Sequence, residues 1–235
     1  EGSAREGLHG MTAGPDGSAF CVWLDLREKG AQVYGARSRD GGATWEPDRL
    51  IYQAPGGTVC QCCHPSAAVG PNGELAVMWR NVIDGSRDMH LARSTDGGAT
   101  FGPAEKLGRG TWRLNTCPMD GGAAAIGPEG VVETVWMREN AVFTAKPGER
   151  ERRLGRGVQG SAAFGPGGPY LAWLAARPGT LLILPPGRDK PFEAADDAND
   201  PVVASAPGGG GPVVAAWESK STGIMILRLD SPGGE

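Results

Sequence analysis

The sequence predicts an all-β fold, a β-propeller of four-stranded antiparallel blades, with five blades favoured over six. Two observations carry this prediction. First, the 39 Gly and 19 Pro residues recur between short apolar runs, as turn residues do in all-β proteins. Second, one short motif returns about every 48 residues, and repeats of this length are typical of propellers and solenoids.

The recurring motif is a Gly-Pro-x-Gly turn followed by an apolar strand that ends in Trp. A lone four-stranded sheet leaves unpaired edges and bare faces, which blades packed around an axis bury. We therefore expect the tryptophans to pack between blades. The turns occupy residues 14–17, 70–73, 127–130, 165–168 and, in degenerate form, 206–208, and the tryptophans are Trp23, Trp79, Trp136, Trp173 and Trp217.

A single domain over residues 1–235 accommodates five such repeats. Segments expected to form the innermost strands, such as 66–68 and 122–125, have small side chains, as strands near a narrow axis must. In the first repeat we expect strands at 10–13, 18–24, 32–38 and 49–53. The approximate repeats are 9–56, 57–110, 111–157, 158–198 and 199–235.

Two repeats carry a sharper motif after their third strand: residues 38–45 read SRDGGATW and residues 94–101 read STDGGATF. In such a turn the Asp side chain accepts hydrogen bonds from the backbone, and Gly supplies left-handed conformations. Both segments resemble the Asp box, or BNR repeat, of the sialidase-like β-propellers. The resemblance implies that the boxes lie away from the active face, so Asp40 and Asp96 are expected to stabilise turns.

The same resemblance raises carbohydrate chemistry as a function. Sialidases use an arginine triad, a Tyr–Glu nucleophile pair and an Asp acid, yet the Arg-Ile-Pro segment of that family is absent here. Tyr34, Tyr52 and Tyr170 fall in strand patterns. Acidic residues such as Asp25 and Glu218 still offer the paired carboxylates that glycosidases need. A carbohydrate-binding or glycoside-hydrolase-like module with structural disulfides and no metal is therefore the alternative function, and whether the chain is an enzyme stays open.

The chemically distinctive residues are cysteines. Three of the five lie in segment 60–64, directly before the inner strand of the second repeat, and a fourth lies in the equivalent loop of the third repeat, residues 114–120. Both loops are expected on the face opposite the Asp boxes, where ring closure brings them side by side at the channel mouth. The candidate metal ligands are Cys60, Cys62, Cys63 and Cys117, with His64 and Met119 as secondary ones.

A soft metal ion is the favoured occupant of this cluster. Thiolates suit Cu(I) and Zn(II), and we favour copper over zinc. If the segment is extended, Cys60 and Cys62 point to one side and join Cys117. If it turns, Cys60 and Cys63 form a Cys-x-x-Cys knuckle. The Cys-x-Cys-Cys cluster also resembles that of a group of sialidase-like bacterial proteins to which no activity is assigned.

Other uses of the sulfurs remain open. Exported proteins commonly oxidise their cysteines, and Cys117 would then bridge to Cys60 or Cys62. Residues 60–64 also satisfy the Cys-x-x-Cys-His signature of covalent haem. A reactive thiol at Cys63, beside a histidine, is a further alternative.

Composition and charge limit the classes of partner that this chain can bind. The net charge is −4 and no uninterrupted basic patch occurs, which argues against nucleic acid. No apolar run reaches the roughly 20 residues of a membrane span. The chain begins at Glu1 rather than Met, so the absence of a leader does not argue for the cytoplasm, and we expect a periplasmic or secreted protein whose partners are a metal ion and a glycan or protein. Cys21, which alternates with Trp23 in a strand, is expected to be buried packing.

Overall fold

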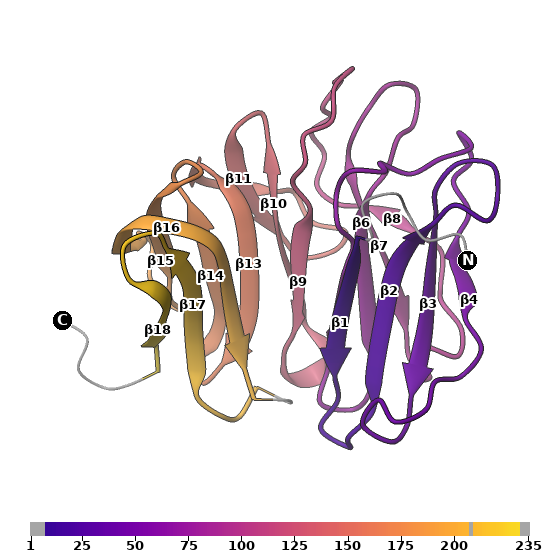
Figure 1. Ribbon diagram of the computed structural model, residues 1–235, viewed down its shortest axis with the longest axis horizontal. Coiled ribbons are helices and arrows are strands. Elements are labelled where there is room, and N and C mark those ends of the chain that lie inside the picture. The colour runs from indigo at the N-terminus through magenta and orange to yellow at the C-terminus, as the bar shows by residue number, and fades with distance from the viewer. Residues whose placement is uncertain (1–7, 207–208, 231–235) are drawn as a thin grey trace.

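The computed structural model describes residues 8–206 and 209–230. It is all-β, with the strands arranged around a central axis (Figure 1). Four antiparallel sheets form in chain order, and each strand pairs with the next one along the chain. The predicted β-propeller of antiparallel blades is therefore confirmed. Among the described residues, no helix has the length and apolarity needed to cross a bilayer.

The first two blades have four strands each. In the first blade the strands begin and end within one residue of the predicted limits, because apolar alternation and Gly-rich turns mark both ends clearly. Blade one contains β1 (His9–Ala13), β2 (Ala19–Asp25), β3 (Gln32–Ser38) and β4 (Arg49–Tyr52), and blade two contains β5 (Ser66–Val69), β6 (Leu75–Arg80), β7 (Met89–Ser94) and β8 (Glu105–Lys106).

The third blade also has four strands, whereas the fourth sheet has six. A short 3₁₀ turn, η1 (Pro128–Gly130), joins the first two strands of blade three. That blade contains β9 (Gly122–Ile126), β10 (Val132–Arg138), β11 (Ala141–Ala145) and β12 (Arg152–Arg156). The fourth sheet contains β13 (Val158–Gly165), β14 (Gly168–Leu174), β15 (Gly179–Leu184), β16 (Phe192–Ser205), β17 (Val213–Ser219) and β18 (Gly223–Arg228).

The prediction of five or six blades is wrong, because one long strand merges the last two repeats. β16 pairs first with β15, and from Ala198 onward it pairs with β17. No turn interrupts it. A bulge between Asn199 and Val202, with Asp200 at a φ of 45°, only bends the strand. The fifth repeat thus extends the fourth sheet instead of forming a blade. Residues 207–208 of its expected turn at 206–208, and its residues 231–235, lie outside the described residues.

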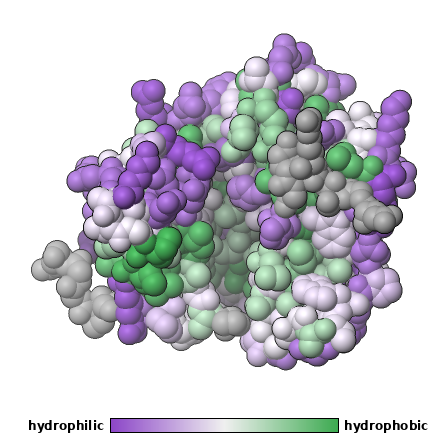
Figure 2. Space-filling view, viewed as in Figure 1, coloured by the Kyte–Doolittle hydropathy of each residue, from purple (hydrophilic) through white to green (hydrophobic). Residues whose placement is uncertain are grey.

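The added strands end in an apolar edge. Ile224 and Ile226 of β18 are 73% and 69% exposed, and Met225 between them is partly exposed. Figure 2 shows this edge as an apolar patch on an otherwise largely polar rim. Within residues 209–230, β18 pairs on one side only, with β17, which explains the exposure.

Small side chains line the centre, as predicted. Segments of β1, β5, β9, β13 and β16 surround a hollow of 390 Å³. The blade tryptophans Trp79, Trp136 and Trp173 are at most 2% exposed, which confirms their packing role. Trp217 is also buried, whereas Trp23 of the first blade is half-buried.

The two segments that resemble Asp boxes, residues 38–45 and 94–101, form the same hydrogen-bonded turn, and we keep the name box for them. Ser38 Oγ donates to Asp40 Oδ1 at 2.8 Å, and the backbone N and Oγ1 of Thr44 donate to the same carboxylate at 2.8 and 2.5 Å. Asp96 accepts the equivalent bonds from Thr100 at 2.9 and 2.6 Å. The prediction that both aspartates stabilise turns is confirmed.

Acid is expected to weaken these turns. The hydrogen bonds from Thr44 lower the pKa of Asp40 to about 2, and those from Thr100 lower the pKa of Asp96. An unfolded Asp titrates near pH 3.9, so the stability that these carboxylates contribute is complete above that pH and is lost as the pH falls further. We expect Asp96→Asn to lower the melting temperature at neutral pH, and the difference from wild type to shrink between roughly pH 5 and pH 2.

Scanning calorimetry over that range tests this expectation. Asp189→Asn is the matched control, because Asp189 is an exposed carboxylate in the connection between β15 and β16, which joins the third and fourth strands of the fourth repeat as the boxes do in the first two. Its melting temperature should follow that of wild type throughout. A difference for Asp96→Asn that stays constant with pH would contradict the role of the ionised carboxylate.

The boxes and the cysteine segment lie at opposite ends of the blades. In blade two, Leu75 pairs with Ser94 at the end that carries the Asp box, while Arg80 pairs with Met89 at the other end. The backbone N of Cys60 donates to Arg80 O at 2.9 Å. The cysteines therefore lie on the face opposite the boxes, as the sequence predicts.

Candidate cysteine site at the channel mouth

Residues 60–63 fold into a tight turn before β5. The bond from Cys60 N to Arg80 O fixes the start of the turn to the end of β6. The turn brings Cys60 Sγ to 3.6 Å from Cys62 Sγ and 3.4 Å from Cys63 Sγ. Of the two backbone alternatives, the turned one forms, and it places three sulfurs together.

Cys117 reaches this turn from the third blade. Its sulfur forms a disulfide with Cys62, across a sequence separation of 55 residues and a Cα–Cα distance of 6.2 Å. The inner strands β5 and β9 pack side by side, which brings their preceding loops together. Of the two bridges that the sequence allowed, Cys62–Cys117 is the one present.

The cluster has a buried half and an exposed half. The sulfurs of Cys60, Cys62 and Cys117 all lie within 4.8 Å of one another, and Cys63 Sγ is 3.9 Å from Cys62 Sγ. Cys60 and Cys63 are each 1% exposed. Cys62 is half-buried and Cys117 is exposed.

The positively charged side chain of Arg87 lies against the buried half. Arg87 Nη1 donates to Cys60 Sγ at 3.0 Å, and Arg87 Nε donates to Leu114 O at 2.9 Å, which links the turn to the loop of the third blade. The hydrogen bond shared with Cys63, helped by the Arg87 charge and opposed by burial, lowers the pKa of Cys60 to about 6. The same hydrogen bond and burial raise the pKa of Cys63. Of the two thiols, Cys60 is therefore the one that loses its proton more readily.

Arg80 holds together the backbone segments next to the cluster. This side chain is 1% exposed and donates only to backbone carbonyls, those of Asp120 at 3.1 and 3.0 Å, Met137 at 2.9 Å and Arg87 at 2.8 Å. Asp120 Oδ2 accepts a bond from Gln159 N at 2.7 Å, and burial raises the pKa of the Asp120 carboxyl. Arg80 thus joins the second and third blades where the two cysteine loops meet.

The secondary candidates face solvent. His64 is exposed, and its ring lies against Gly121, where an added Cβ would come within 2.6 Å of it. Met119 is 68% exposed, at a turn position with a φ of 51°. The remaining thiol, Cys21 in β2, is half-buried rather than fully buried as expected, and it is free.

Sequence reasoning missed Arg80, Arg87 and Asp120 as parts of this site. Arg80 had one available signal, a charged residue directly after the apolar strand that ends in Trp79. Arg87 stands in a polar loop and had none. Its contact with Cys60 depends on how the loop folds back, which no local pattern encodes.

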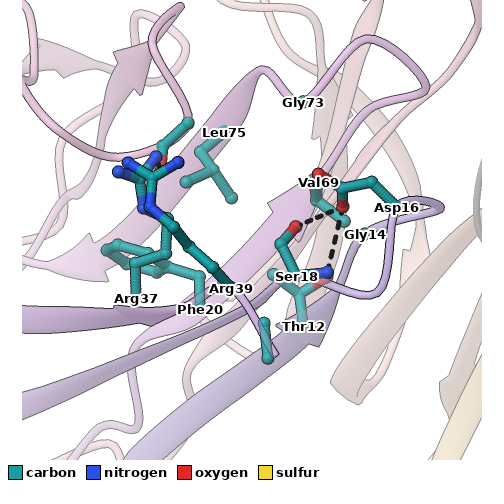
Figure 3. A pocket seen from close by; sticks show the side chains of 12 residues that line it. Thr12, Gly14, Asp16, Ser18, Phe20, Arg37, Arg39, Val69, Gly73 and Leu75 are labelled. Atoms are coloured by element: carbon teal, nitrogen blue, oxygen red, sulfur yellow. Dashed lines mark hydrogen bonds between the residues drawn. The ribbon is translucent and has the colours of Figure 1, made fainter. Parts of the chain in front are cut away.

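A separate hollow of 260 Å³ lies at the Asp-box end between the first two blades (Figure 3). Asp16 there accepts bonds from the backbone N and Oγ of Ser18 at 3.0 and 2.6 Å. Arg37 donates to Gly97 O at 2.8 Å and pairs with Glu46 at 3.1 Å. Asp16 and Arg37 are thus satisfied within the chain, while Arg39, which also lines the hollow, is 69% exposed and pairs with Glu46 at 2.6 Å.

No protein-family model and no curated protein matches this chain. Solved structures do resemble it. The Hadza microbial sialidase Hz136 is 16% identical with a TM-score of 0.62, and the alignment covers 100% of this chain but 59% of the sialidase, so the chain spans less than two thirds of that protein. A fucose-specific lectin from Aleuria aurantia is 12% identical with a TM-score of 0.62, over 96% of this chain and 76% of the lectin.

A GH43_1 enzyme from Xanthomonas citri is 14% identical with a TM-score of 0.54, over 99% of this chain and 88% of that enzyme. At such identities the likeness concerns architecture and not activity. The chain therefore has the β-propeller fold that a sialidase, a fucose-specific lectin and a GH43 enzyme share.

Proposed function

We propose that this chain is an exported, sialidase-like propeller that binds one soft metal ion, copper in preference to zinc, at the mouth of its channel. The proposed ligands are the reduced sulfurs of Cys60, Cys62, Cys63 and Cys117. The observation that carries the proposal is the convergence of these sulfurs from two blades, three of them within 4.8 Å of one another.

The spacing of the sulfurs suits a metal centre. A metal about 2.3 Å from each sulfur separates its ligands by about 3.8 Å in a tetrahedral site and about 4.0 Å in a trigonal one. Within the turn, Cys60 lies 3.4 Å from Cys63 and 3.6 Å from Cys62. Small side-chain rotations would therefore open a site, and the softness of thiolate favours Cu(I).

The charges around the cluster also suit this chemistry. Three thiolates around Cu(I), or four around Zn(II), carry a net negative charge, which Arg87 beside Cys60 would partly offset. Covalent haem fits less well. Both sulfurs of a Cys-x-x-Cys motif must reach the macrocycle, yet Cys60 and Cys63 are each 1% exposed.

The disulfide supports an extracytoplasmic location, since such bridges persist mainly in oxidising compartments. It also sets a condition for metal binding. Cys62 and Cys117 become ligands only after reduction, because a bridged sulfur has no thiolate to offer.

The decisive test is a metal titration of reduced protein, purified without a metal-affinity column. We expect one equivalent of Cu(I), measured by competition with bathocuproine disulfonate, and weaker binding of Zn(II). Cys60→Ser should lower the affinity for Cu(I) by more than the roughly 10–100-fold that loss of an outer-shell partner costs.

Cys21→Ser is the matched control, because it removes a free cysteine that lies outside the cluster. It should leave the stoichiometry and the affinity unchanged. Reduced wild type that binds Cu(I) no better than Cys60→Ser would refute the metal site.

A carbohydrate-related function is the second candidate, and the presence of a sialidase and a fucose-specific lectin among the structural neighbours favours it. In that case the Cys62–Cys117 bridge would only tie two loops together. Glycan binding by oxidised, metal-free protein, undiminished in Cys60→Ser, would support this candidate instead.

A further inference from the structure

The cysteine cluster combines a disulfide with a pair of thiols in contact with it. The bridge between Cys62 and Cys117 occupies the exposed half, and the free thiols of Cys60 and Cys63 occupy the buried half. A structural disulfide needs only its own two cysteines. The extra pair, held at 3.4 Å from each other, therefore calls for a separate explanation.

The separation of the sulfurs suits thiol–disulfide exchange, in which a thiolate attacks a disulfide sulfur in line with the bond that breaks. Cys60 Sγ lies within 4.8 Å of Cys117 Sγ, so rotation of the Cys60 side chain must complete that alignment. Cys60 Sγ lies 3.6 Å from the bridged sulfur of Cys62, close to the separation of a reacting pair, about 3–3.5 Å. Arg87 Nη1 donates to Cys60 Sγ at 3.0 Å and stabilises negative charge on the attacking atom. Cys63 Sγ lies 3.4 Å from Cys60 Sγ, so it is placed to make a second attack, on Cys60.

We propose that the cluster is an intramolecular thiol–disulfide relay that moves the disulfide between an exposed position and a buried one. Cys60 attacks Cys62 Sγ, a Cys60–Cys62 bond forms, and the Cys62–Cys117 bond breaks with its electron pair leaving on Cys117. Cys63 then gives up its proton, which the thiolate released on Cys117 takes up, and attacks Cys60 Sγ. A Cys60–Cys63 bond forms, and Cys62 leaves as a thiolate.

The relay consumes one disulfide and forms one, so it needs no external oxidant or reductant. Its outcome is an exposed thiol at Cys117 and a disulfide between two residues that are each 1% exposed. Cys117 is the exposed cysteine, so its thiol is the one that reacts with molecules in solution. The partner that we infer is therefore a thiol or a disulfide in solution. The exchange does not require a metal and stands independently of the proposed metal site.

Alkylation of the native, oxidised protein tests the relay. The protein carries Cys21→Ser to remove the remaining thiol, and EDTA and bathocuproine disulfonate exclude metals. Iodoacetamide is added at pH 8, and disulfides and labels are mapped by mass spectrometry. We expect labels on Cys117 and Cys62 to accumulate together with a Cys60–Cys63 disulfide, because alkylation traps the released thiols.

Two variants separate the steps. Cys60→Ser lacks the attacking sulfur, so labelling of Cys117 should be at least ten-fold slower than in the parent. Cys63→Ser blocks only the second step, so Cys117 should still be labelled and a Cys60–Cys62 disulfide should accumulate. Circular dichroism melts of the variants confirm that each is folded before labelling.

Labels on Cys60 or Cys63 with the Cys62–Cys117 bridge intact would overturn the relay. Equal labelling of Cys117 in the parent and in Cys60→Ser would do the same, since the thiol would then be released without attack from Cys60. Failure of the reduced protein to bind Cu(I) would leave these results unchanged, so the two proposals fail separately.

Discussion

Replacing Arg80 with methionine is expected to lower the free energy of unfolding by about 3 kcal/mol. The guanidinium is fully buried and donates to the carbonyls of Asp120, Met137 and Arg87. Methionine fills most of the volume but donates no hydrogen bond. Each carbonyl left unpaired away from water costs about 1–3 kcal/mol, and the removal of a buried charge offsets part of that cost.

Urea denaturation measures this change, and Arg93→Met is the matched control. Arg93 lies on β7 of the same blade, its side chain is 45% exposed, and its ion pair with Glu105 is long, at 3.9 Å. A change at such a site is expected to stay within about 0.5 kcal/mol. If Arg80→Met changed the free energy of unfolding as little as the control does, the carbonyls would have found other donors. The hydrogen bonds of Arg80 between the two blades would then contribute no stability.

The fold was predictable where the determinants are local. Apolar alternation marks strands such as β2 and β3, and the sequence around Asp40 encodes its own turn through hydrogen bonds to the next few residues. The number of blades was not predictable in this way. Residues 192–205 contain no glycine, and their one proline, Pro201, falls in the bulge, so whether β16 ends or continues depends on its pairing with both β15 and β17.

The candidate site likewise has features that the sequence predicts and features that it does not. The meeting of the 60–63 turn with the loop of Cys117 follows from ring closure, which the repeats predict. The choice of Cys62 as the partner of Cys117 depends on the conformation of a tight turn, and the left-handed backbone at Met119 carries that side chain to solvent. Arg87 contacts Cys60 across 27 residues, so only the folded loop reveals its role.

Reduction of the Cys62–Cys117 disulfide is expected to cause the largest loss of stability. The bridge spans 55 residues, and loop-closure entropy for a loop of that length corresponds to about 4 kcal/mol at 25 °C. Guanidinium denaturation of metal-free wild type with and without a phosphine reductant measures the loss. Cys62→Ala combined with Cys117→Ala should give the same loss without reductant and no further change with it. An unfolding midpoint that reduction leaves in place would contradict the expectation.

The reduced state then separates the two candidate functions, because a metal that binds only the folded protein must stabilise it. At a free metal concentration 100 times the dissociation constant, binding contributes about 2.7 kcal/mol, which would recover more than half of what reduction removes. We expect Cu(I) to restore stability in reduced wild type and to have no effect in reduced Cys60→Ser, in which the sulfur common to the two shortest pairs in the turn is missing. A disulfide-stapled carbohydrate module predicts no recovery in either protein, since its cysteines act only as a covalent link. The direction of the metal effect on reduced protein therefore decides whether the convergence of sulfurs at the channel mouth is a binding site or a staple.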